Sequence, residues 1–487
     1  MRLSLLFLAA ASIFAQAPVA PKPIEPAPVV RKHSIKLNGK TYNYSTTAGR
    51  LSIANDQGEP EAHMFFVAYT LDNPEPRRPL MFSFNGGPGS ASVWLHMGLL
   101  GPKIVKMQDD GSYPPPPFEL VDNPHSFLPF TDMVFIDPVG TGYSRAAKPE
   151  LGKKFFGVQG DITSVGDFIR VWLSRYQRWN SPLYMIGESY GTFRAAGVAG
   201  YLVDHGVAFN GVCLISSILN FQTARFAPGN DLPYSLFLPT YTAIAWYHKK
   251  LGAGLQADLR EAVRESEQYA AGEYVVTLAK GDRLTPDERE KAVDKLHRLT
   301  GLEKRYLEEH DLRIEINHFT KELLREKGTT VGRLDGRITG VEGLNGDPLP
   351  EFDPSLTAIR PPYTALFNDY ARRELGYESD LQYFILGGGI GPWDFGQGGN
   401  NRYAETTGAL RQAFAKNPYM RVYVGSGYYD LATPFFATEY TFSHLGLPQK
   451  YKSQITMKMF PAGHMFYVYK PALVELSKDI EAFVTKK

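Results

Sequence analysis

The stretch PLYMIGESYGTFRAAGVAGYLV, residues 182–203, carries the strongest structural signal in this sequence. It begins with the short β-prone run 183–187 and ends with small and apolar residues that favour a closely packed helix. Between them stands GESYG, residues 187–191, in which glycines enclose a carboxylate and a hydroxyl. Because glycine accepts the backbone conformations of a tight turn, the stretch predicts a strand that turns sharply into a helix.

Further β-prone runs surround this stretch along the chain. In the first half they are 64–70, 80–85, 133–137 and 211–217, and a helix-like run covers 161–179. After residue 380 the pattern returns, with β-prone runs at 421–427 and 455–460 and a closing helix over 471–484. Buried strands that alternate with helices predict an α/β fold, with a mostly parallel sheet and helices on both faces.

The block between residues 225 and 365 has a different character. Charged helical patterns dominate it, and Thr285, Pro286 and Glu288 together form a helix-start signal. The parallel-strand pattern does not continue through this block. We therefore predict one α/β domain in two parts, 33–224 and 366–487, separated by a mainly helical cap over 225–365.

The first residues predict export. Arg2 precedes the apolar run 3–14, and small residues follow at Ala15 and Ala17, as in a secretory signal peptide cleaved after Ala15. A short N-terminal membrane anchor is the alternative interpretation. Residues 16–32 are rich in proline and predict an extended linker. The mature protein is then expected to be secreted or periplasmic, without an integral membrane span.

Composition excludes several classes of function. Lys and Arg together number 52 and Asp and Glu 51, so the net charge offers no basis for nucleic-acid binding. The one cysteine, Cys213, lies in the apolar run GVCLISS and is interpreted as a buried strand residue. The sequence has no CxxC, HExxH or EF-hand spacing. We expect neither a metal nor another cofactor.

GESYG is the only match to the pattern G-x-S-x-G, which presents a nucleophilic serine on a strand-to-helix turn. A serine hydroxyl needs a base to remove its proton and an acid to orient that base, and in this architecture they follow in the order Ser, acid, His. His464, after the run 455–460, is the candidate base. The alternative, His444, resembles the end of a surface helix.

Asp430 is the candidate acid, because it follows the β-prone run 421–427 and precedes a turn. Asp394 competes with it, but no clear strand leads into that residue. The glycine-rich segment FSFNGGPGSAS, residues 82–92, lets backbone N–H groups approach a ligand closely. Gly87 and Tyr190 are the candidate donors of an oxyanion hole.

Five blocks in this order resemble the serine carboxypeptidases, α/β-hydrolase-fold enzymes that remove C-terminal residues from peptides. The blocks are FNGGPGS (84–90), NPHSFLPFTDMVFIDPVGTGYS (123–144), GESYGT (187–192), YYDLATP (428–434) and AGHM (462–465). The similarity runs from about residue 60 to the end and is weakest in the cap. It implies a triad of Ser189, Asp430 and His464.

The resemblance also implies that Asn85, Gly86 and Glu188 bind the terminal carboxylate of the substrate. A protonated Glu188 can donate a hydrogen bond to that group, whereas an ionised one would repel it. Burial and the incoming charge both raise a glutamate pKa, so such binding favours acidic pH. The alternative role for Glu188 is to cap the following helix.

Two departures from the family stand out. Ser90 occupies a position where members commonly carry a cysteine, and with Cys213 alone this chain lacks the family's disulfides. Many members also carry a second glutamate that partners the one beside the nucleophile, and here the matching residue is Leu99. The loss of that carboxyl makes a strongly acidic working range an open question.

We therefore predict a serine-type carboxypeptidase that acts on peptides with a free C-terminus through an acyl-enzyme on Ser189. An esterase or acyltransferase with the same triad is the first alternative, because the residues that would discriminate lie in the poorly matched cap. A non-catalytic binding protein that reuses the hydrolase fold is the second.

Overall fold

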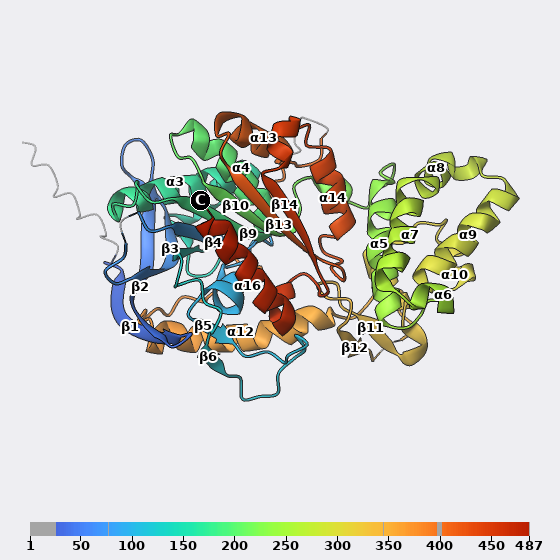
Figure 1. Cartoon of the computed structure of the whole chain (residues 1–487), viewed down its shortest axis with the longest axis horizontal. Helices are drawn as coiled ribbons and strands as arrows, with labels where there is room; N and C mark the ends of the chain where they lie inside the picture. The colour runs from blue at the N-terminus through green and yellow to red at the C-terminus, as the bar shows by residue number, and fades with distance from the viewer. Residues whose placement is uncertain (1–25, 76, 344, 397–401, 487) are drawn as a thin grey trace, which may run out of the picture.

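The computed structural model describes residues 26–75, 77–343, 345–396 and 402–486, and a ten-stranded sheet forms its centre (Figure 1). In sheet order, the strands are β1 (Val29–Leu37), β2 (Lys40–Ala54), β3 (Pro60–Leu71), β7 (Asp132–Ile136), β4 (Leu80–Phe84), β9 (Leu183–Ser189), β10 (Gly211–Ser217), β13 (Arg421–Gly427) and β14 (Ile455–Phe460), and β8 (Arg145–Ala146) pairs with β3. Every neighbouring pair from β7 to β14 is parallel, whereas β1, β2, β3 and β7 pair antiparallel. The predicted mostly parallel sheet is confirmed.

Helices cover both faces of this sheet. Successive strand residues point to opposite faces, so neighbouring residues of one strand pack against different helices. Met185 packs in a core cluster with α3 (Val158–Arg175), α4 (Tyr190–Asp204) and α13 (Thr407–Lys416). Its neighbour Ile186 packs in the other cluster, with α12 (Pro354–Arg373) and α16 (Lys470–Thr485). Cys213 lies fully buried in this second cluster and is free, as the sequence predicted.

The inserted block forms a helical lobe beside the sheet (Figure 1). Its helices are α5 (Leu232–Tyr247), α6 (Ala253–Gln256), α7 (Leu259–Ala271), α8 (Glu273–Lys280), α9 (Pro286–Thr300), α10 (Lys304–Glu309) and α11 (Ile316–Glu322), followed by the hairpin β11 (Thr329–Val331) and β12 (Thr339–Val341). These helices bury a further hydrophobic cluster, to which Tyr429, Leu431 and Phe435 of the α/β domain also contribute. Thr285 and Glu288 form the capping box that starts α9.

Two predicted boundaries differ from the structure. The cap was expected to end at 365, but that position lies inside α12, whose Ile359 and Phe367 belong to the core under the sheet. The linker was expected to end at 32, but β1 begins at Val29, because the end of the proline-rich tract pairs with β2. The predicted signal peptide and the rest of residues 1–25 lie outside the described residues.

Shorter elements connect these layers. They are α1 (Val93–Leu95), η1 (His96–Leu100), β5 (Lys103–Val105), β6 (Leu120–Asp122), η2 (Pro149–Leu151), α2 (Gly152–Phe155), η3 (Phe221–Thr223), η4 (Gly281–Arg283), η5 (Arg325–Lys327), α14 (Phe435–Ser443), α15 (Gln449–Lys452) and η6 (Phe466–Val468). Among the described residues, no helix combines the length and the apolar character that crossing a membrane would need.

The turn between β9 and α4 is as sharp as the sequence predicts. Ser189 adopts a positive φ of 59°, which side chains other than glycine rarely accept. A Cβ atom on Gly187 would stand 2.2 Å from the carbonyl oxygen of Gly191, and one on Gly191 would stand 2.8 Å from that of Phe84. Backbone thus packs directly on backbone around Ser189, and both flanking glycines are required.

We predict that Gly187→Ala lowers the free energy of unfolding by about 3 kcal/mol, because its methyl group meets rigid backbone. Gly254→Ala, on α6, is the matched control, since no atom lies within 4 Å of the added carbon. Urea unfolding followed by circular dichroism compares the two variants. Equal unfolding midpoints would contradict this account of the turn.

Candidate active site

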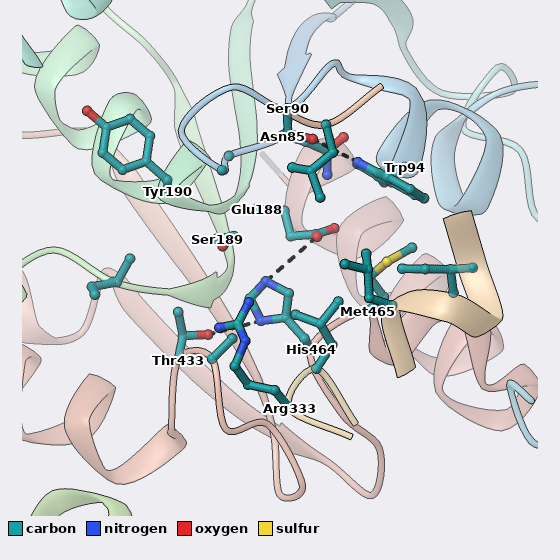
Figure 2. A pocket seen from close by; sticks show the side chains of 18 of the residues that line it. Asn85, Ser90, Trp94, Glu188, Ser189, Tyr190, Arg333, Thr433, His464 and Met465 are labelled. Atoms are coloured by element: carbon teal, nitrogen blue, oxygen red, sulfur yellow. Dashed lines mark hydrogen bonds and ion pairs between the residues drawn. The ribbon is translucent and has the colours of Figure 1, made fainter. Parts of the chain in front are cut away.

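A cavity of about 260 Å³ opens at the carboxyl ends of the parallel strands (Figure 2). Its lining includes Asn85 after β4, Glu188 and Ser189 at the end of β9, Thr433 after β13 and His464 after β14. In open parallel sheets, ligands bind at this edge because loops from several strands meet there. The cavity therefore collects polar side chains that are far apart in the sequence.

Asp430 and His464 form a buried pair at the edge of this cavity. The Nδ1 atom of His464 lies 2.8 Å from the carboxylate Oδ2 of Asp430. Burial is the largest single influence and lowers the pKa of His464, but the charge and hydrogen bond of Asp430 together with the charge of Glu188 raise that pKa above its ordinary value. Ser189 lines the same cavity, which Figure 2 shows together with the imidazole of His464. Of the three residues predicted as a triad, His464 therefore contacts Asp430 and lines the same cavity as Ser189.

Asp430 is held in place by hydrogen bonds from its own loop. The backbone N–H groups of Ala432 and Thr433 donate to its Oδ1 at 2.8 and 3.0 Å, and the Thr433 hydroxyl donates to Oδ2 at 2.7 Å. These three hydrogen bonds fix the orientation of the Asp430 side chain, whose Oδ2 also faces the imidazole of His464. The role of Thr433 was not predicted, although a hydroxyl three residues after a candidate Asp is a usable local signal.

The two competing candidates lie elsewhere. His444 is exposed at the end of α14, where its ring contacts the backbone of Tyr440. Asp394 accepts a hydrogen bond from the backbone of Gly396 in a turn, and neither residue lines the cavity. The hydrogen bonds of both side chains are local, although the backbone of Asp394 also pairs with the segment 156–158.

The glycine-rich turn after β4 packs directly on the start of α4. A Cβ atom on Gly86 would stand 2.4 Å from the backbone nitrogen of Tyr190, and Gly87 has a φ of 101°. The Tyr190 ring turns away from the cavity to stack on Phe193, so Tyr190 offers the site its backbone N–H (Figure 2). The backbone groups predicted as oxyanion donors thus lie on adjoining segments.

Glu188 is a buried carboxyl beside His464. Burial raises the pKa of Glu188 from 4.5 to about 7, although His464 and a hydrogen bond from Tyr467 act in the opposite direction. The Tyr467 hydroxyl donates to Oε2, while Oε1 stands 4.0 Å from the Nε2 atom of His464. The side chain of Glu188 therefore faces the cavity and contacts Tyr467, which does not support the helix-capping alternative.

Asn85 presents a donor beside Glu188. Its Oδ1 accepts from the backbone of Leu95 at 3.0 Å, which directs the amide nitrogen the other way. That Nδ2 group lies close enough to Glu188 to lower the pKa of its carboxyl slightly, yet has no hydrogen-bond partner of proper geometry among the described residues. A buried donor without a partner is costly, so this amide is suited to a ligand.

Two tyrosines, Tyr363 and Tyr467, pack against the segment that carries Leu99, the residue at the position of the absent second glutamate. Leu99 is fully buried on η1, and a Cβ atom on the adjoining Gly98 would stand 2.6 Å from both Tyr363 Oη and the Tyr467 ring. Glu188 therefore has a phenol as its partner instead of a second carboxyl. Sequence alone assigns no role to Tyr467, because it resembles an ordinary core aromatic residue.

The cap contributes to the cavity as well. Arg333 and Leu334, which follow β11, line it beside His464. This contact joins segments about 130 residues apart, and no local pattern predicts it. Among the described residues, no group of three or more His, Cys, Asp or Glu side chains could hold a metal ion.

Comparison with known proteins agrees with the predicted resemblance. Residues 38–251 match the family model described as serine carboxypeptidase. The Carboxypeptidase Y homolog of Arthroderma benhamiae is 31% identical over 131 residues, which cover 26% of this chain and 23% of that protein. Serine carboxypeptidase-like 36 of Arabidopsis thaliana is 32% identical over 136 residues, 26% of each chain. The match thus spans about a quarter of the length of these relatives.

A solved structure extends the likeness to nearly the whole chain. Kex1(delta)p, a prohormone-processing carboxypeptidase from Saccharomyces cerevisiae, superimposes with a TM-score of 0.54. The match covers 91% of both chains at 16% sequence identity. At this identity the likeness concerns the fold, and it confirms the predicted α/β-hydrolase architecture.

We predict that Glu188→Gln stabilises the protein at pH 8 but not at pH 4. In the folded protein Glu188 titrates near pH 7 and in the unfolded chain near 4.5, so stability is lost as pH rises through this window. Removing the ionisable group should recover up to about 3 kcal/mol at pH 8. Urea unfolding at both pH values measures this, with the exposed Glu119→Gln as control. A pH-independent difference would contradict it.

Proposed function

We propose that this chain, whose residues 38–251 match the serine carboxypeptidase family model, is a serine-type carboxypeptidase that removes C-terminal residues from peptides. The observation that carries the proposal is the pair of buried groups beside the nucleophile candidate. Glu188 has a pKa near 7, and the Asn85 amide lacks a partner among the described residues. Two such donors fit a carboxylate next to the scissile bond.

Substrate binding places the terminal carboxylate of the peptide on this pair. The Asn85 amide and protonated Glu188 each donate a hydrogen bond to it, and the backbone of Gly86 contributes a third contact. Tyr467 holds the other oxygen of Glu188 and orients the carboxyl. A peptide that ends in an amide lacks the charge these donors are arranged to accept.

Acylation follows from the buried pair beside Ser189. His464 takes the proton of the Ser189 hydroxyl at Nε2, while its Nδ1–H donates to Asp430. Asp430 fixes the tautomer and stabilises the imidazolium that forms. The backbone N–H groups of Gly87 and Tyr190 donate to the oxyanion of the tetrahedral intermediate.

Collapse of this intermediate breaks the last peptide bond. His464 gives its proton to the departing amine, and the terminal amino acid leaves with Ser189 acylated. Water then enters, loses a proton to His464 and attacks the acyl carbon. The shortened peptide is released with a new free C-terminus, and the hydroxyl of Ser189 is restored.

We also propose that the enzyme works outside the cytoplasm. This proposal depends on the signal-peptide pattern over 1–15 and on the proline-rich tract that follows it. Residues 1–25 lie outside the described part of the chain. A protein with one buried, free cysteine does not depend on disulfide formation for its stability in that compartment.

The proposed activity predicts cleavage of a blocked dipeptide with a free C-terminus, measured as release of the free amino acid. The C-terminal amide should be cleaved far more slowly, because it offers Asn85 and Glu188 no charge. Ser189→Ala should lower kcat by at least about 10⁴-fold. Cleavage of simple esters without cleavage of peptides would favour an esterase or acyltransferase. Failure of a fluorophosphonate probe to label Ser189 would favour a binding protein.

The role of Glu188 predicts a difference between substrates in their pH dependence. With a peptide acid, kcat/KM should fall as pH rises through about 7, because Glu188 then ionises. An ester without a carboxylate should not follow this limb, and Glu188→Gln should remove it for peptides. Identical pH profiles for both substrates in the wild-type enzyme would refute carboxylate recognition by Glu188.

A further inference from the structure

The segment 333–337, between the cap strands β11 and β12, lies across the two loops that carry Asp430 and His464. The backbone N–H of Leu431 donates to the carbonyl of Arg333 at 3.0 Å. The backbone N–H of His464 donates to the carbonyl of Leu334 at 2.6 Å. The cap therefore supplies a wall of the cavity that is hydrogen-bonded to the catalytic loops.

The backbone of Arg333 is fixed on its other side as well. Its N–H donates to Oδ1 of Asp353 at 3.1 Å, and the next N–H, of Leu334, donates to the hydroxyl of Ser355 at 2.9 Å. With its carbonyl bound to Leu431, Arg333 is held from both directions. Its side chain thus extends from a defined point on the rim of the cavity.

The guanidinium of Arg333 faces the cavity beside His464 and Thr433 (Figure 2). The residue is exposed, and no carboxylate among the described residues lies within ion-pair distance of it. Arg337, on the same segment, has the opposite arrangement, because it is paired with Asp335 at 2.6 Å and packs over the Tyr469 ring. The guanidinium of Arg333 is therefore able to pair with a negatively charged group of a ligand in the cavity.

The lining of the cavity differs between the side of Glu188 and the side of Arg333. Trp94, Ile359 and Met465 line it and belong to one core cluster, which makes an apolar wall. Glu188 lies on one side of the His464 ring and Arg333 on the other (Figure 2). A terminal residue held at Glu188 places its side chain on the apolar wall, so the preceding residue extends toward Arg333.

The charge of Arg333 also acts on the catalytic pair. Being positive, it lowers the pKa of His464 and opposes the imidazolium that forms during attack. A substrate anion paired with Arg333 would cancel this effect. An acidic side chain at this position should therefore improve both binding and turnover.

We propose that Arg333 selects peptides with Asp or Glu at the penultimate position, by pairing its guanidinium with that side-chain carboxylate. The inference rests on the proposed carboxypeptidase activity and specifies its substrate class. Charge-assisted hydrogen bonds of this kind discriminate against neutral analogues of the same shape. Glutamate and glutamine at the penultimate position are therefore the informative pair of substrates.

The test measures kcat/KM for blocked dipeptides that end in leucine and carry Glu, Gln or Lys before it. The wild-type enzyme should prefer Glu over Gln by about tenfold, and Arg333→Gln should abolish the preference while Gln peptides are still cleaved. Arg333→Glu should favour Lys instead. Arg305→Gln, an exposed arginine of the cap paired with Glu309, is the matched control and should retain the preference for Glu.

Three outcomes separate this inference from the function on which it rests. An equal Glu-to-Gln ratio in wild type and Arg333→Gln, with both peptides cleaved, would overturn the role of Arg333 alone. A preference for acidic residues at the terminal instead of the penultimate position would also overturn it. If no peptide with a free C-terminus is cleaved by the wild type, the proposed carboxypeptidase activity itself fails.

Discussion

The close packing of backbone around Ser189 is the constraint on which the rest of the site depends. Gly187 and Gly191 let strand β9 turn directly into α4, and Gly86 lets the preceding turn lie against the Tyr190 N–H. Beneath them the buried pair of Asp161 and Arg194 adds a hydrogen bond from Arg194 to the carbonyl of Asn85. One set of backbone contacts thus positions the proposed nucleophile, the proposed oxyanion donors and the proposed carboxylate site together.

The position of Glu188 suits the proposed binding of a carboxylate but lowers the stability of the folded protein as pH rises. Its place beside Ser189 puts its carboxyl in the cavity, where burial disfavours the charged form. Tyr467 supplies one hydrogen bond to it but no charge. A carboxyl with a pKa near 7 keeps a large neutral fraction up to about that pH, and the neutral form can donate a hydrogen bond to an anion. Glu188 with its phenol partner is therefore suited to bind a carboxylate up to about neutral pH.

Much of the fold and site could be predicted from the sequence because the signals are local. The β9 turn, Asp430 and His464 each follow a recognisable strand. Tyr467 beside Glu188 and Arg333 beside His464 could not be predicted, because they depend on contacts between distant segments. The cap boundary was misplaced because α12 resembles the preceding helices in sequence, and only its packing under the sheet assigns it to the core.

The central claim is that a neutral Glu188 reads the carboxylate of the substrate, and proton uptake on binding tests it most directly. Calorimetric titration of Ser189→Ala with a blocked dipeptide, in buffers of different ionisation enthalpy, counts the protons taken up. At pH 8, above the pKa of Glu188 near 7, the account predicts uptake of about one proton, and almost none at pH 5. Adding Glu188→Gln should abolish the uptake at pH 8. Binding at pH 8 without proton uptake would contradict the account.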